Sequence, residues 1–316
     1  MIGRKPFFLV LWVLLLAAAL VSEGAAERIP YTTVDIGGMT YLIEDAARYD
    51  APEVVRRQAE SFYRGLEEHP EVRSYVYLVN SSRTVKIPEE VTAVPKVYET
   101  IRACFDRSVT DYLRLGSLEE YGAYFYTTDH HWNYRGSYAG YTQIVHMLLG
   151  EEEPVLSPAE TVEFPIPFNG SLNKNIRRKD SRENFTVYRF EYPPMKVEVN
   201  GKPGVYGNQE AYFAGRYARS SYANHYNAFY GGEAATVHVE TEREDRGNLL
   251  VFSNSMSDAL NLLLAGHFHH TWIVDLKHMS ETMKRFHLST AVTEWDIDQV
   301  LILGDGLYFG TEYVYE

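Results

Sequence analysis

The sequence predicts an α/β fold: a three-layer sandwich in which helices cover both faces of a mostly parallel β-sheet. The strongest indication lies in the C-terminal third, where short apolar strands alternate with helical segments across short links. Strands that follow one another in this way pair in parallel through right-handed crossovers. The composition agrees, because 45% apolar and 23% charged residues are the balance of an ordinary globular domain.

Elements of the first half are predicted from periodicity and residue type. The segment RSYVYLV (73–79) alternates and is rich in aromatic and β-branched residues, which is typical of a strand. Apolar residues recur at helical spacing within 52–69. By the same reasoning we expect strands at 40–43 and 124–126 and helices at 94–104 and 137–149.

The C-terminal third repeats strand and helix. Three apolar segments are predicted strands: LLVF (249–252), TWIVDL (271–276) and QVLIL (299–303). Helices are predicted between them, at 258–266 and 280–287.

Residues 1–26 are expected not to belong to the fold. Arg4 and Lys5 precede residues 6–22, which carry no charge, and the small residues at 24–26 suit signal peptidase. We expect a cleaved signal peptide; the alternative is an uncleaved membrane anchor formed by residues 6–22. Either implies export, to the extracellular space or the cell envelope.

The remaining residues, 27–316, are expected to form one large α/β domain. Within it, residues 151–247 are rich in Gly, Pro, Asn and Tyr and hold few long periodic runs. This texture predicts an insertion of short strands and loops over one end of the sheet.

Charge and cysteine count exclude several classes of protein. Thirty basic against 43 acidic residues give a formal charge of −13, which disfavours binding to nucleic acid. The single cysteine excludes an internal disulfide framework and any multi-cysteine metal site. We expect no cofactor, no metal ion and no nucleic-acid partner.

Two polar segments are expected at the carboxyl ends of strands, where ligands bind in parallel sheets. Residues 129–132 (DHHW) follow one predicted strand and residues 253–257 (SNSMS) follow another, and each precedes a helix. A serine at such a turn exposes its hydroxyl, a histidine can act as its base, and a carboxylate can fix the histidine tautomer. The pattern raises the hypothesis of a triad of Asp129, His131 and Ser255, in that chain order.

Four residues of these segments also have a purely structural interpretation. Ser257 is a candidate N-cap for the following helix, and Ser253 is expected to lie on the strand itself. Asp129 could cap the helix that follows it, and His130 could be a packed histidine.

The stretch YFYTTDHHWNYRGSYAGYTQI (124–144) resembles the signature of the DHHW family, exported bacterial proteins related to the SGNH-like acetyltransferase domains of the alginate O-acetylation machinery. LLVFSNSMSDALNLLLAGHFHHTWIVDL (249–276) resembles the strand–Asp-Ser–helix–strand–Asp segment of that family. The block FNGSL (168–172) and the ending DIDQVLILGDG (296–306) are also similar. The resemblance covers most of residues 40–310.

This resemblance implies an SGNH-hydrolase-like fold in which the motifs follow a permuted chain order. It places Asp129, His131 and Trp132 in the Asp-x-His-Trp motif and the nucleophile at Ser255. It also implies acyl-group chemistry on an extracellular polysaccharide. A transferase would need a membrane acetyl-relay protein as partner, or a donor already outside the cell, because exported enzymes lack acetyl-CoA.

The groups that would hold the oxyanion are less closely specified. One donor is expected to be the backbone N–H of Met256, and the other a side-chain amide, for which Asn254 and Asn227 are the candidates. Trp132 and Tyr226 are further candidates for contact with substrate or oxyanion.

Three hypotheses from different classes follow. The leading one is an exported serine-dependent O-acetyltransferase or acetylesterase acting on a cell-surface or extracellular polysaccharide. In it, His131 takes the Ser255 proton as Ser255 attacks an acetyl carbonyl, and the acetyl group then passes to a sugar hydroxyl or to water. The second is a catalytically inactive relative that binds glycan or scaffolds an export complex. The third is a metal phosphoesterase of the DHH type, which would need further Asp-rich motifs to bind two metal ions.

Overall fold

The computed structural model describes residues 31–177, 183–232, 234–279 and 285–315. The predicted leader, residues 1–26, lies outside this range, as does most of the helix expected at 280–287. Within the described ranges, no helix combines the length and the apolar character needed to cross a bilayer.

Twelve strands are present in the described residues: β1 (Tyr31–Ile36), β2 (Met39–Glu44), β3 (Arg73–Leu78), β4 (Val109–Tyr112), β5 (Glu160–Pro167), β6 (Asn184–Arg189), β7 (Met195–Val199), β8 (Lys202–Pro203), β9 (Thr236–Thr241), β10 (Leu249–Ser253), β11 (His270–Val274) and β12 (Gln299–Gly304). The helices are η1 (Ala46–Tyr49), α2 (Pro52–Gly65), α3 (Lys96–Cys104), α4 (Leu118–Tyr124), α5 (Tyr134–Leu149), α6 (Ser171–Ile176), α7 (Gln209–Phe213), α8 (His225–Tyr230), α9 (Asn261–Ala265), α10 (Leu288–Glu294) and α11 (Gly306–Phe309).

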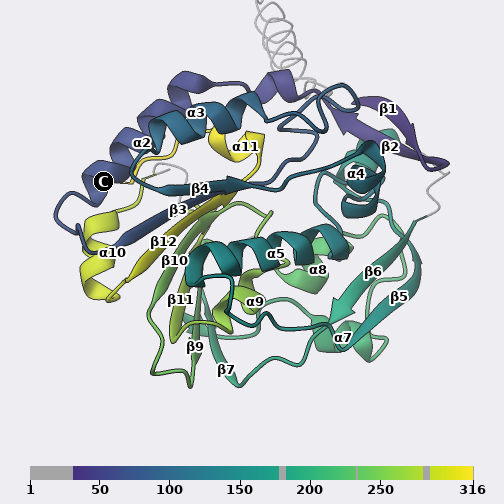
Figure 1. Cartoon of the computed structure of the whole chain (residues 1–316). Coiled ribbons are helices and arrows are strands. Elements are labelled where there is room, and N and C mark those ends of the chain that lie inside the picture. Colours follow the sequence, from purple (N-terminus) through teal and green to yellow (C-terminus); the bar gives the residue numbers. More distant parts are fainter. Residues whose placement is uncertain (1–30, 178–182, 233, 280–284, 316) are drawn as a thin grey trace, which may run out of the picture. The chain divides into compact units, whose positions relative to one another are not determined.

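Eight of the strands form one sheet in the order β4-β3-β12-β10-β11-β9-β7-β8 (Figure 1). The five strands from β4 to β11 are parallel, and β9, β7 and β8 continue the sheet in antiparallel fashion. The predicted fold class, an α/β sandwich around a mostly parallel sheet, is confirmed.

Alternation along the central strand explains the three layers. On β10, Leu249 and Val251 pack into one apolar core, and Leu250 and Phe252 pack into the core on the opposite face. The first core includes side chains of α5 and α9, and the second includes side chains of α2, α3, α10 and α11. Because successive side chains of a strand point to opposite faces, a fully apolar strand requires cover on both.

The strand expected at 124–126 is wrong. Tyr124 is instead the last residue of α4, a helix capped by Ser117, whose hydroxyl accepts the N–H of Glu120. Phe125 makes only an isolated bridge with Trp132. The outer strand of the parallel block, β4, has only four residues and was not expected from the sequence.

The helix expected at 258–266 begins later. Residues 254–260 form turns, and α9 starts at Asn261. Ser257 therefore does not cap it; the Ser257 hydroxyl donates to the Asn254 carbonyl at 3.4 Å. Ser253 lies at the end of β10, on the strand as expected.

Residues 151–247 contribute strands to two different sheets. β5 and β6 form a separate two-stranded antiparallel ribbon, next to which α7 and α8 pack aromatic side chains into a third apolar cluster. β7, β8 and β9, from the same stretch of sequence, join the main sheet.

Candidate active site

The DHHW segment lies in the loop between α4 and α5. Asn133, not Asp129, caps α5: its side-chain oxygen accepts the N–H groups of Arg135 and Gly136. The Asp129 side chain instead makes hydrogen bonds within the loop, where it accepts the backbone N–H of His131 at 3.0 Å.

Asp129, His131 and Ser255 form one continuous chain of hydrogen bonds. The Asp129 carboxylate meets Nδ1 of His131 at 2.6 Å, and Nε2 of His131 meets the Ser255 hydroxyl at 2.7 Å. Asp129 and His131 are buried, and Ser255 is half-buried. The structure thus brings together three residues that span 126 positions of the chain, with the histidine between carboxylate and hydroxyl.

Trp132 ties the histidine loop to the serine loop. Its indole N–H donates to the Met256 carbonyl at 2.9 Å, and its ring is fully buried against α5. Gly140 permits this contact, because a side chain there would overlap the Trp132 ring. Trp132 has no exposed surface, and its indole N–H is taken by the Met256 carbonyl, so its described contacts are structural; its expected contact with substrate or oxyanion stays a prediction.

The Asp129 carboxylate is strongly stabilised in its charged form. Burial raises its pKa, but the charges of His131 and His130 and the hydrogen bonds from His131 and Ser171 outweigh burial and hold the pKa well below its usual range. The Ser171 N–H reaches the carboxylate at 2.6 Å because Gly170 packs directly against Asp129, where no Cβ would fit. The FNGSL block therefore supports Asp129.

The ring of His131 is held between two other rings. The His130 ring lies 3.9 Å away on a 38° tilt, and the Tyr226 ring is stacked on His131 at 3.9 Å and 10°. Tyr226 is almost fully buried, and its hydroxyl donates to the Ser255 carbonyl at 3.2 Å. Tyr226 thus orients both the histidine and the serine loop.

His130 is bound through one nitrogen only among the described residues. Its Nδ1 lies 2.8 Å from the Ser171 hydroxyl and 3.6 Å from Asp129. Burial, Arg83 and His131 lower its pKa well below the usual value, so the ring is neutral at physiological pH.

Asp129, His130 and His131 also bring three possible metal-ligand atoms within 4.8 Å of one another. Both nitrogens of His131 are engaged, by Asp129 and Ser255, and Nδ1 of His130 is engaged by Ser171. A metal ion at this cluster would have to replace these hydrogen bonds.

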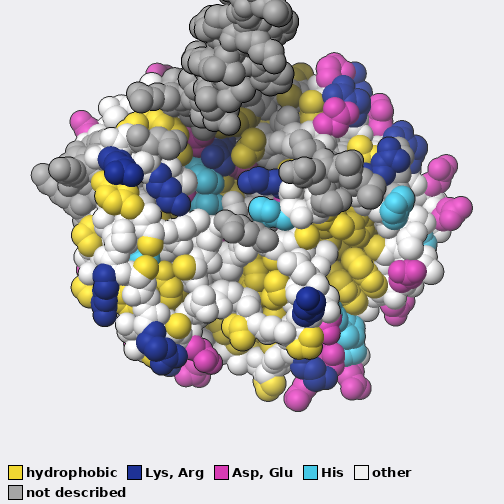
Figure 2. Space-filling model, turned by 180° about the vertical axis from the view of Figure 1, so that it is seen from behind, with side chains coloured by type: hydrophobic (Ala, Val, Ile, Leu, Met, Phe, Trp, Pro, Cys, Tyr) yellow, Lys and Arg dark blue, Asp and Glu magenta, His cyan; other side chains and the backbone are white. Residues whose placement is uncertain are grey.

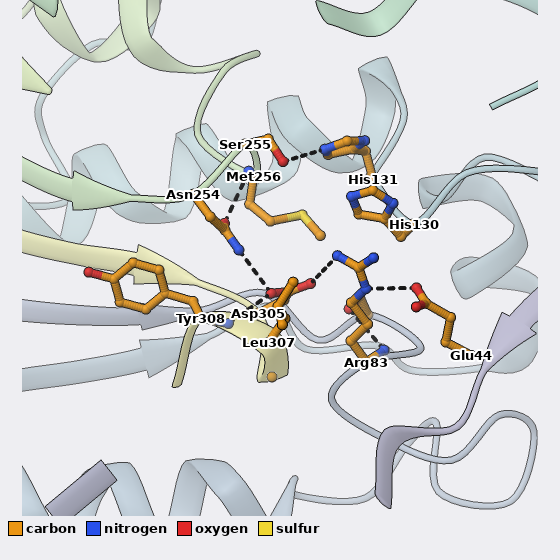
Figure 3. A network of polar contacts seen from close by, with 12 residues as sticks. Glu44, Arg83, His130, His131, Asn254, Ser255, Met256, Asp305, Leu307 and Tyr308 are labelled. Atoms are coloured by element: carbon orange, nitrogen blue, oxygen red, sulfur yellow. Dashed lines mark hydrogen bonds and ion pairs between the residues drawn. The ribbon is translucent and has the colours of Figure 1, made fainter. Parts of the chain in front are cut away.

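A buried polar network supports the serine loop from below (Figure 3). The side-chain N–H of Asn254 donates to Asp305 at 3.1 Å, and Asp305 lies 3.7 Å from Arg83. Arg83 in turn donates through Nε to Glu44 at 2.6 Å. The parallel register places the ends of β10, β12 and β3 side by side, which brings these residues to one edge of the sheet.

The candidate oxyanion donors differ in their partners. The backbone N–H of Met256 donates to the Asn254 side-chain oxygen at 3.2 Å, and the Asn254 amide N–H is directed to Asp305. The Asn227 side chain is half-buried and lines the pocket beside Ser255. Of the two candidate amides, Asn227 is therefore the better placed to donate to a ligand.

Ser255 opens into a pocket of about 430 Å³. Arg83, His130, Ser171 and Lys277 are among its lining residues. In the space-filling view, histidine and Lys or Arg side chains gather around a hollow on one face (Figure 2). A pocket of this size can admit a sugar residue or a small ester.

Sequence reasoning missed four residues of this site: Arg83, Ser171, Glu183 and Asp305. Ser171 belongs to a block that resembles the DHHW family but had been given no role, and Asp305 lies two residues after the predicted strand 299–303. Arg83 and Glu183 carry no local pattern that would have singled them out.

The raised pKa of the Glu183 carboxyl is expected to make the stability of the fold depend on pH. It accepts the Thr127 N–H and hydroxyl, both at 2.8 Å, and burial raises its pKa from 4.5 to about 7. Between these values the carboxyl ionises in the unfolded chain but not in the fold, so stability falls as the pH rises through this window. We expect the melting temperature of the wild type to decline more across it than that of Glu183→Gln. Parallel melting curves would contradict this role.

No protein-family model matches the sequence, and no curated protein matches it significantly. Among solved structures, a DHHW family protein from Eubacterium siraeum aligns with a TM-score of 0.64 and 17% identity, over 93% of this chain and 98% of that chain. Bacillus cereus PatB1 aligns with a TM-score of 0.63 and 16% identity, over 89% of this chain and 97% of that chain.

PatB1 with a sulfonyl adduct gives a TM-score of 0.62 at 15% identity, over 89% of this chain and 100% of that chain. The O-acetyltransferase domain of Pseudomonas putida AlgJ gives 0.42 at 8% identity, over 90% and 94%. The sequence identities to the DHHW family protein and to PatB1 are low, so the structural similarity shows that this chain shares their fold. The SGNH-hydrolase-like fold expected from the DHHW resemblance is thereby confirmed.

Proposed function

We propose that this protein is an exported serine-dependent O-acetyltransferase or acetylesterase that acts on a cell-surface or extracellular polysaccharide. The observation that carries the proposal is the chain of hydrogen bonds from Asp129 through His131 to Ser255, at 2.6 and 2.7 Å. A buried, ionised carboxylate behind a histidine and a half-buried serine in front of it form the arrangement that activates a hydroxyl as a nucleophile.

In the proposed first step, Ser255 Oγ forms a bond to the carbonyl carbon of an acetyl ester while its proton passes to Nε2 of His131. The Asp129 carboxylate, on the other ring nitrogen, stabilises the imidazolium. The tetrahedral intermediate collapses, and the leaving alcohol takes the proton from His131. An acetyl group is then left on Ser255.

The second step runs in reverse with a different partner. A sugar hydroxyl, or water, gives its proton to His131 and attacks the acetyl-serine, which restores Ser255. A sugar acceptor makes the protein a transferase, supplied by a membrane acetyl-relay protein or by a donor outside the cell. Water makes it an esterase.

The oxyanion has two candidate donors in this scheme. The Met256 N–H is held by the neutral Asn254 oxygen at 3.2 Å, and a charged oxyanion competes favourably for such a donor. We assign the second donor to the amide of Asn227, which faces the pocket. Export rests on residues 1–26, whose charge and apolar pattern is typical of a signal peptide or anchor.

Intact-protein mass spectrometry tests the proposal. The purified chain is incubated with p-nitrophenyl acetate, and separately with phenylmethanesulfonyl fluoride, which sulfonylates activated serines. We expect one acetyl and one sulfonyl adduct, each mapping to Ser255 and absent from Ser255→Ala.

Ser257→Ala is the matched control, because Ser257 lies in the same loop and its hydroxyl bonds only the Asn254 carbonyl among the described residues. It should keep both adducts. Adducts that persist in Ser255→Ala, or a folded wild type that forms none, would refute the proposed nucleophile and favour the glycan-binding alternative.

A further inference from the structure

The side of the pocket next to His131 must receive the acceptor. In the proposed reaction, the oxygen that leaves or attacks exchanges its proton with Nε2 of His131, so it lies within hydrogen-bond reach of that atom. The centre of the His130 ring lies 3.9 Å from that of the His131 ring, and His130 lines the same pocket. His130 is therefore one of the pocket residues adjacent to the position of the reacting oxygen.

His130 has a nitrogen available for such a group. Its Nδ1 is engaged by Ser171 and lies near Asp129, and the nearby carboxylate favours the tautomer with the proton on Nδ1. Nε2 then carries a lone pair, and no described residue donates a hydrogen bond to it. A neutral imidazole nitrogen of this kind accepts a hydrogen bond from a hydroxyl group.

Arg83 supplies a donor beside it. Its guanidinium is directed toward His130 and lines the pocket (Figure 3). Nε is bound by Glu44 and Nη1 lies near Asp305, whereas Nη2 has no hydrogen bond to a described residue. Two carboxylates offset the single charge, so this edge of Arg83 acts as a hydrogen-bond donor rather than as a site for an anion.

We propose that His130 Nε2 and Arg83 Nη2 form a subsite for a hydroxyl group vicinal to the one that is acetylated or deacetylated, so that the substrate is a neutral sugar with a free 1,2-diol. The subsite rests on the proposed function. The vicinal hydroxyl donates its proton to His130 and accepts one from Arg83, while the neighbouring oxygen reacts at His131. The subsite forms only non-covalent contacts and adds no chemical step to the reaction.

A pair of simple acceptors tests this subsite. With p-nitrophenyl acetate as donor, trans-cyclohexane-1,2-diol and cyclohexanol differ only in the vicinal hydroxyl. For the full-length wild type we expect the diol to be acetylated about three- to tenfold faster per hydroxyl group, the range expected for one neutral hydrogen bond. In His130→Phe, which keeps an aromatic ring against His131, the ratio of the two rates per hydroxyl group should fall to near one.

The ratio cancels any effect of the substitution on acetyl-enzyme formation, so a merely structural role of His130 would leave it unchanged. His278→Phe is the control, because His278 lines the same pocket but pairs with Asp275 at 3.7 Å; it should keep the wild-type ratio. A wild-type ratio of one, or a ratio that survives in His130→Phe, overturns the subsite.

A wild type that forms no acetyl-enzyme would count against the proposed function rather than against the subsite. The subsite is then tested by binding alone, through the NMR signals of the His130 imidazole. The diol should shift them and cyclohexanol should not. Equal shifts with both compounds, or none with either, would overturn the subsite.

Discussion

Replacing His131 by alanine is expected to lower the rate of acetyl-enzyme formation by about 10⁴- to 10⁶-fold, the loss seen when the base of a serine triad is removed. The physical reason is that the Ser255 hydroxyl then loses the 2.7 Å partner that takes its proton. A neutral hydroxyl attacks an ester poorly, and in the variant only water could accept its proton in place of the oriented imidazole. The measurement is pre-steady-state release of p-nitrophenolate from p-nitrophenyl acetate.

The control for this prediction is His146→Ala. His146 lies in the last turn of α5, pairs with Glu151 at 3.4 Å and is not among the residues that line the Ser255 pocket. Its removal tests whether losing any histidine disturbs the fold, and we expect a rate within a fewfold of the wild type. A loss of less than tenfold in His131→Ala would mean that Ser255 reacts without this base, or that another group acts in its place.

Replacing Trp132 by alanine is expected to lower the free energy of unfolding by about 3–5 kcal/mol. The ring is fully buried, and removing it would leave a cavity between the histidine loop, the serine loop and α5. The indole N–H also satisfies the Met256 carbonyl, which would lose its partner. Urea unfolding followed by circular dichroism measures the loss.

Trp132→Phe separates packing from hydrogen bonding. It keeps an aromatic ring against Gly140 but cannot donate to Met256, so we expect a smaller loss than in the alanine variant. If Trp132→Ala were destabilised by less than about 1 kcal/mol, the contacts of the indole with the histidine and serine loops would not contribute the expected stability.

Strands and helices with a clear pattern of apolar residues could be predicted from the sequence. Segments whose secondary structure depends on tertiary packing could not. β3, β10 and β12 read as strands because their residues are apolar or β-branched on both faces, which only a covered sheet accommodates. The segment around Tyr124 is aromatic too, yet it ends a helix. There the Tyr121 and Phe125 rings stack at 4.6 Å within the core, and burial overrides the intrinsic β-preference of aromatic residues.

The sequence by itself determined the pairing of Asp129 with His131, because two residues of one loop meet through local hydrogen bonds. Together with the DHHW resemblance it also indicated Ser255 and an exported α/β protein. It did not determine which groups would surround them. Arg83 and Asp305 follow β3 and β12 in the chain, and Ser171 begins α6. Only the parallel register of the sheet and the packing of α6 bring Arg83 and Ser171 to the pocket and Asp305 against Asn254 of the serine loop. Long-range contacts of this kind leave no periodic trace in the chain, so tertiary structure alone decided the polar lining beside the serine.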